Sequence, residues 1–213
     1  MKDAFKASEW LGIAVFGISV LTVLGWIFNI SPLTSSILPG TISVKFITAL
    51  LLTLVGVILT VIGAAHRRQI DVTPIVVFGC GFIILLLTGT LLYTTIAGGH
   101  DGVSTLFVTE GPGAAQTLFP GRPPVATMIV LVLVCIVAGI GTVWSEKAHP
   151  TIKAIGVLVT AAGAIPIIGY IVGVEAMYYG GIAWTNPMPI KEAFVLVLLG
   201  AGLWLIGRTP HRR

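Results

Sequence analysis

The sequence predicts an all-α membrane protein of six transmembrane helices, arranged as three helical hairpins, and three observations predict it. Hydrophobic residues make up 56% of the 213 residues, charged residues only 9%, and the mean hydropathy is +1.04. A soluble domain usually carries about 25% charged residues. The apolar residues fall into six long stretches, and a Pro-containing turn recurs before the second helix of each hairpin.

Each apolar stretch is long enough to cross a bilayer, which takes roughly 20 residues of helix. The first stretch follows Lys2 and Lys6, as a signal peptide would, but it continues past Trp26 without a small-x-small cleavage pattern. We therefore expect a retained helix with tryptophans at both interfaces. The expected spans cover residues 10–29, 44–65, 75–97, 125–144, 152–174 and 189–207.

Basic residues near the helix ends predict the orientation, because cytoplasmic flanks carry an excess of Lys and Arg. Nine lie on one side of the spans and three on the other. We therefore expect both termini and the 66–74 and 145–151 loops in the cytoplasm. The nine are Lys2, Lys6, Arg67, Arg68, Lys147, Lys153, Arg208, Arg212 and Arg213, and the three are Lys45, Arg122 and Lys191.

The second helix of each hairpin begins with a similar segment, so the chain reads as one transmembrane domain, 1–213, of three repeats. The segments are Ile37–Leu50, Leu118–Met128 and Asn186–Phe194. Thr48 and Glu192 each precede a glycine by eight residues, and Ala126 is aligned with them. Pro near the first turn of a helix costs no hydrogen bond. The copies cover about 1–68, 69–147 and 148–213, and because each starts and ends on one side they are parallel, not inverted, repeats.

These segments carry a resemblance to a known family. The matching motifs are Phe28–Gly40 with Lys45–Leu50, then Gly89–Gly99, Val103–Phe107 and Pro120–Pro124, then Gly169–Gly173 and Met188–Leu199. They resemble the integral-membrane sensory domain at the N-terminus of prokaryotic PAS-containing histidine kinases and diguanylate cyclases. The resemblance implies a sensory module in the cell (inner, cytoplasmic) membrane of a prokaryote. Such a domain normally feeds a cytoplasmic output module, and the chain ends at Arg213, so we expect it to signal through a separate protein.

Catalysis, cofactors and nucleic acid are not expected. A buried haem needs His within the spans, but His66, His100, His149 and His211 lie at span ends or in loops. The acidic residues, Glu192 among them, also lie at ends or in loops, which disfavours proton-coupled transport. Enzyme motifs such as G-x-S-x-G or H-E-x-x-H are absent. We predict no catalytic, cofactor-binding or metal-binding residue and no enzyme, and the net charge of +4 follows from the orientation signal.

The outer segments hold the candidate site, a surface for an apolar ligand or a partner subunit. Lipid or quinone could contact these segments, which carry several aromatic residues between spans. Interfacial anchoring explains the aromatic residues equally well, and Glu175 is expected as an interfacial carboxylate. The candidate residues are Phe107, Phe119, Arg122, Glu175, Tyr178, Tyr179 and Trp184.

Two functional hypotheses follow. In the first, the chain is a non-catalytic, sensor-like module that detects an apolar or redox-related cue and shifts a helix against a partner protein. In the second, it is an accessory subunit that packs against a larger respiratory or photosynthetic membrane complex. Both predict a membrane-protein partner in addition to the lipid bilayer.

Overall fold

The computed structural model describes residues 2–35, 42–68, 72–98, 102, 119–143, 145–179 and 185–208. Eight helices and no strand occur within these residues. Six of the helices are long and apolar enough to cross a membrane, which confirms the prediction of an all-helical, multi-pass protein. The helices are α1 (Lys2–Ile27), α2 (Ser31–Thr34), α3 (Phe46–Arg68), α4 (Thr73–Ile96), α5 (Val125–Val143), α6 (Ser145–Val172), α7 (Glu175–Tyr178) and α8 (Ile190–Arg208).

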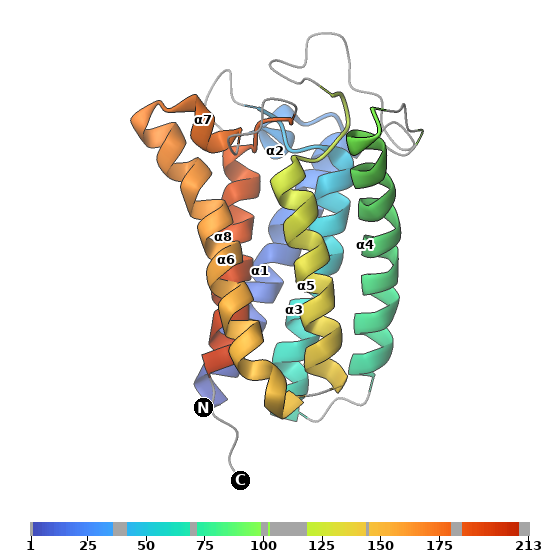
Figure 1. Ribbon diagram of the computed structural model, residues 1–213, viewed down its shortest axis with the longest axis vertical. Coiled ribbons are helices and arrows are strands. Elements are labelled where there is room, and N and C mark those ends of the chain that lie inside the picture. Colours follow the sequence, from blue (N-terminus) through green and yellow to red (C-terminus); the bar gives the residue numbers. More distant parts are fainter. Residues whose placement is uncertain are drawn as a thin grey trace.

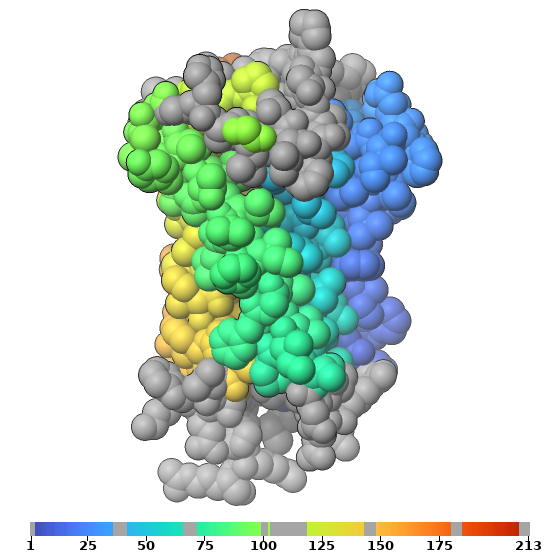
Figure 2. All heavy atoms as spheres, turned by 90° about the vertical axis from the view of Figure 1, so that its right-hand side faces the viewer, coloured from blue at the N-terminus to red at the C-terminus, as the bar shows by residue number. Residues whose placement is uncertain are grey.

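The long helices form a bundle (Figure 1), in which burial distinguishes three inner members from three outer ones. In α3, α5 and α8 the most apolar stretch is 56%, 50% and 56% buried, whereas in α1, α4 and α6 it is 28% buried. Figure 2 shows the outer helix α4 lying across one face of the bundle. The fully buried core is built largely from leucines of the inner helices, including Leu51, Leu131, Leu196 and Leu199.

Each inner helix packs against the outer helix that precedes it in the chain, and also against the outer helix of another pair. Thus α3 packs on α1, α5 on α4, and α8 on α6, while α8 also contacts α1 and α5 also contacts α6. The Lys2 end of α1 and the Arg208 end of α8 lie at one end of the bundle (Figure 1). The short helices α2 and α7 lie at the other end, which we call the outer end.

The backbones of α6 and α8 approach so closely that they need glycine at the contact. A Cβ on Gly200 would lie 2.4 Å from the Thr160 nitrogen, and one on Gly156 would lie 2.5 Å from the Trp204 nitrogen. In the α1–α3 pair, a Cβ on Gly56 would lie 2.6 Å from the Phe16 nitrogen. Small residues at such contacts let membrane helices associate through van der Waals packing.

The outer ends of α1 and α6 are built alike. Each ends in a residue with positive φ, Asn29 (56°) after α1 and Gly173 (73°) after α6. The next backbone N–H then reaches back to the last turn, from Ile30 to the Gly25 carbonyl (2.7 Å) and from Val174 to the Gly169 carbonyl (2.9 Å). This is the Schellman arrangement, which satisfies carbonyls at a helix end. It turns the chain directly into the short helices α2 and α7.

The inner connection before α6 differs from expectation. Residues 145–151 were expected as a loop, and the structure instead has them as the first two turns of α6, with Pro150 inside the helix. The patterned apolar stretch begins only at Ile152, so hydropathy alone placed the helix start too late. Similarly, α1 begins eight residues before the expected span. Both extensions are polar turns that continue a membrane helix past its apolar part.

The glycine contact between α6 and α8 makes a stability prediction. We expect Gly200→Leu to lower the free energy of unfolding by about 3 kcal/mol, since overpacking forces the two backbones apart. Gly89→Leu on α4 is the matched control, because a Cβ at Gly89 meets nothing within 4 Å. Denaturant unfolding in detergent, followed by circular dichroism, measures both. Equal losses in the two variants would contradict the packing described here.

Candidate functional site

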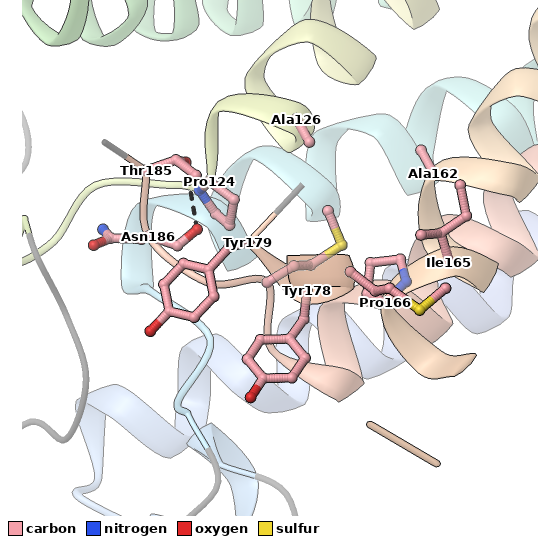
Figure 3. A pocket seen from close by; sticks show the side chains of 11 residues that line it. Pro124, Ala126, Ala162, Ile165, Pro166, Tyr178, Tyr179, Thr185 and Asn186 are labelled. Atoms are coloured by element: carbon pink, nitrogen blue, oxygen red, sulfur yellow. Dashed lines mark hydrogen bonds between the residues drawn. The ribbon is translucent and has the colours of Figure 1, made fainter. Parts of the chain in front are cut away.

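A cavity of about 180 Å³ lies at the outer end of the bundle, between α5, α6 and α7. Its walls are mostly apolar, and Tyr178 and Tyr179 stand at one side of it (Figure 3). Ile165 on α6 is 46% exposed on the lipid-facing surface and also lines the cavity, so the cavity extends to the membrane side of the bundle. The lining residues are Pro124, Ala126, Ala162, Ile165, Pro166, Met177, Tyr178, Tyr179, Thr185, Asn186 and Met188.

Asn186 fixes the wall of the cavity that faces α5. Its Oδ1 accepts a hydrogen bond from the Phe119 N–H (2.9 Å), and its Nδ2 donates to the carbonyls of Phe119 (2.6 Å) and Arg122 (2.8 Å). The neighbouring Thr185 hydroxyl accepts a hydrogen bond from the N–H of Val125 (2.9 Å). Val125 is the first residue of α5. Four hydrogen bonds, two of them buried and two partly buried, therefore connect the segment before α8 to the first residue of α5 and to the residues just before it.

Tyr178 and Tyr179 line the opposite wall, and Tyr170 stacks on Tyr178. The rings of Tyr170 and Tyr178 stack at 4.5 Å, and Tyr179 lies 5.5 Å from Tyr178. The Tyr170 hydroxyl donates to the Met188 carbonyl (2.9 Å), which ties α6 to the segment before α8. Partial burial, with the negative charge of Glu175, raises the pKa of Tyr178.

The structure brings together two pairs of the residues that the sequence singled out. Phe119 and Arg122 form a cation–π pair (5.3 Å), and Tyr178 and Tyr179 line the cavity. Asn186 links them, since it bonds the first pair and lines the cavity with the second. Arg122 is 7% exposed and faces the Phe119 ring, so it is not an open surface cation. Glu175 is exposed at the start of α7. Phe107 and Trp184 lie outside the described residues.

The inner helices begin with the same backbone hydrogen bond, which aligns their first turns. The N–H groups of Ala49, Met128 and Ala193 donate to the carbonyls of Lys45, Pro124 and Pro189 (3.0, 3.1 and 2.9 Å). Residues Thr48, Thr127 and Glu192 therefore hold the same place in α3, α5 and α8. All three are fully buried (0% exposed). The sequence alignment placed Ala126 here, which was wrong by one residue.

The environment of Glu192 differs from the sequence prediction, which placed this residue at the end of a span. It does lie in the first turn of α8, but its side chain is enclosed in the bundle and not at the interface. Its Oε1 accepts a hydrogen bond from the Thr127 hydroxyl of α5, and Lys45 lies close enough for its charge to act on the carboxylate. Lys45 itself is only 2% exposed. Ionisable groups enclosed within a membrane bundle are costly and usually carry a function.

The signal that could have located Glu192 was present in the sequence. Thr48 and Glu192 each precede a glycine by eight residues, and those glycines, Gly56 and Gly200, both lie at close backbone contacts. A position eight residues before a packed glycine belongs to the same broad stripe of the helix, so it is expected to face the bundle. A carboxylate aligned with a packed threonine should therefore have been expected inside.

The Asn186 hydrogen bonds make a second prediction. We expect Asn186→Ala to lower the free energy of unfolding by about 3 kcal/mol, because it leaves the buried Arg122 carbonyl and two partly buried backbone groups of Phe119 without partners. Thr90→Ala is the control, since that exposed hydroxyl bonds only the Leu86 carbonyl of its own helix. Thermal unfolding in detergent compares the two variants. A loss at Asn186 no larger than at Thr90 would mean that the segment before α8 does not hold α5.

Comparison with known proteins gives no information about the function of the chain. No family model matches the chain, no curated protein matches it, and no solved structure matches it. The resemblance to PAS-linked sensory domains thus stays a prediction based on short motifs. The cavity and the buried carboxylate are the features from which a function can be inferred.

Proposed function

We propose that the chain is a non-catalytic, sensor-like membrane protein that binds an apolar ligand in the outer cavity and acts on a separate partner protein. One observation carries the proposal: the cavity wall is the segment that is hydrogen-bonded to the start of α5. Small-molecule sites are typically concave and mostly apolar with a few fixed polar groups. The cavity has this character, with Thr185 and Asn186 as the polar groups.

A route from the cavity into the bundle supports the transmission step. Ala126 lines the cavity, and the next residue, Thr127, donates a hydrogen bond to Glu192 on α8. A ligand that displaces the first turn of α5 must therefore strain or break the bond to α8. Helix α8 runs from this bond to Arg208 at the opposite end of the bundle. A shift of α8 would thus reach a partner at that end.

In this proposal the bundle consists of three parallel repeats with both termini in the cytoplasm of a prokaryotic cell, and the outer end faces away from the cytoplasm. The excess of basic residues at the end that holds Lys6 and Arg208 supports the orientation. The matched turns after α1 and α6, and the matched first turns of the inner helices, support the repeat.

A cavity-filling variant tests ligand binding. We expect Ala162→Phe to fill the cavity and to abolish recovery of an apolar ligand in organic extracts of the purified protein, as measured by mass spectrometry. Ile168→Phe on the same helix is the control, because Ile168 is 47% exposed on the lipid-facing surface and does not line the cavity. Extracts that are identical for both variants and the parent protein would contradict binding in this cavity.

Purification in mild detergent, with mass spectrometry of co-purifying proteins, tests the partner. Recovery with a kinase or cyclase supports the sensor-like function. Stoichiometric recovery with a respiratory or photosynthetic complex would replace that function with an accessory subunit. Recovery of the chain alone, after cross-linking in intact membranes, would contradict both.

A further inference from the structure

The ligand of the outer cavity can be inferred from a second place in the bundle that is built in the same way. The α1–α2 and α6–α7 segments make the same hydrogen bonds, residue for residue. The Ser35 and Tyr179 N–H groups bond the Ser31 and Glu175 carbonyls. The chain then returns to the short helix, from the Val44 N–H to Thr34 and from the Met188 N–H to Tyr178 (2.9 and 2.8 Å). The two outer ends are therefore structural counterparts.

Side chains repeat the correspondence. The Trp26 ring N–H of α1 donates to the Val44 carbonyl (2.8 Å), just as the Tyr170 hydroxyl of α6 donates to the Met188 carbonyl (2.9 Å). A Cβ on Gly25 would meet the Leu33 Cβ at 2.5 Å, and one on Gly169 would meet the Met177 Cβ at 2.6 Å. Each of the two outer helices also contacts one inner helix of a neighbouring hairpin: α1 contacts α8, and α6 contacts α5.

The linings of the two places differ in several side chains, and one of these differences lies in the first turn of the inner helix. Lys191 precedes Glu192 in α8, and Ala126 precedes Thr127 in α5, so they hold the same position in the first turn. The Lys191 ammonium donates to the carbonyls of Leu33 (2.7 Å) and Pro32 (3.3 Å) in α2. The corresponding carbonyls in α7 belong to Met177 and Ala176.

The volumes of the two places agree with this difference. The gap beside Lys191 is about 10 Å³ and is lined by Ile18, Thr22 and Val44, among others. Their counterparts Ala162, Pro166 and Met188 line the cavity of about 180 Å³ beside Ala126. The Lys191 side chain fills the first place. At the second place the corresponding residue is Ala126, and the space is open (Figure 3).

The charges around the open cavity favour a cation. Among the residues that the structure describes, no Lys, Arg or His lines the cavity. The Glu175 carboxylate lies one turn before Tyr178, and its charge acts on that residue. The rings of Tyr178 and Tyr179 line one wall, and aromatic faces attract ammonium groups at about 6 Å or less.

We propose that the outer cavity binds a primary ammonium group attached to an apolar chain. The ligand would lie between α5 and α7, in the position that corresponds to the Lys191 side chain between α8 and α2. The ammonium donates to the carbonyls of Ala176 and Met177, and the chain lies between Ala162 and Pro166 toward the lipid-facing side. This inference rests on the proposed function and names the ligand class of the same cavity.

Thermal unfolding of the purified chain, in a maltoside detergent and amine-free phosphate buffer, tests the proposal with n-hexylamine and its uncharged analogue n-hexanol. At saturation we expect n-hexylamine to raise the unfolding temperature by on the order of 5 °C, and n-hexanol to leave it nearly unchanged.

Three variants sharpen the test. Ala126→Lys should be more heat-stable than the parent chain and should no longer respond to n-hexylamine. Ala126→Leu fills the cavity without charge and should also lose the response. Lys191→Ala should unfold at a lower temperature and regain part of the loss in n-hexylamine but not in n-hexanol.

The outcomes separate this inference from the proposed function. Equal stabilisation by n-hexylamine and n-hexanol would overturn the ammonium site while leaving an apolar ligand in the cavity. An undiminished n-hexylamine response in Ala126→Lys would also overturn it, because the amine would then bind elsewhere. No response to n-hexylamine in the parent chain overturns it too, and ligand recovery from the Ala162→Phe variant then decides the proposed function independently.

Discussion

The structure depends on one constraint: within a membrane, polar groups at the outer ends of the inner helices must find partners inside the protein, since no water is present to solvate them. The hydrogen bond from Thr127 to Glu192 meets this need and joins α5 to α8. Lys45 supplies a nearby positive charge at the start of α3. An unpaired carboxylate here would be strongly destabilising. These three residues therefore set how the first turns of α3, α5 and α8 lie relative to one another.

The rest of the outer end follows from these fixed first turns. Asn186 and Thr185 lie just before α8 and hold the start of α5, so the segment around them becomes a rigid wall. Helix α6 is tied to that wall through the Tyr170 hydroxyl. Between the wall and α6, the short side chain of Ala126 leaves a space unfilled, and this space is the cavity. The cavity thus lies where a backbone arrangement that occurs twice in this chain carries a smaller side chain than its counterpart.

The close glycine contacts explain why the helix pairs keep their arrangement. Contacts at Gly56 and Gly200 bring α3 and α8 against their outer partners, α1 and α6, at backbone distance. Tight packing of this kind resists sliding, because either helix would have to lift over the other. Movement in response to a ligand is therefore expected between pairs, at α5 against α6 and α8, and not within a pair.

Much of the helix content was predictable from the sequence, because apolar stretches of membrane length have few alternative structures. Helix starts were less predictable: residues 145–151 continue α6 although they are polar. The burial of Glu192 was missed because a carboxylate in a first turn usually faces water, and only its alignment with Thr48 indicates otherwise. The cavity could not be predicted, since it depends on how α5, α6 and α7 meet across residues far apart in the chain.

The coupling free energy between Thr127 and Glu192 tests the central claim most directly. It is measured by a double-mutant cycle of Thr127→Val, Glu192→Met and the double variant, from denaturant unfolding in detergent. A buried hydrogen bond between a hydroxyl and a carboxyl group predicts a coupling of about 1 to 2 kcal/mol. Losses that add within about 0.5 kcal/mol would show two independent sites, and α5 and α8 would then not be joined at their outer ends as described.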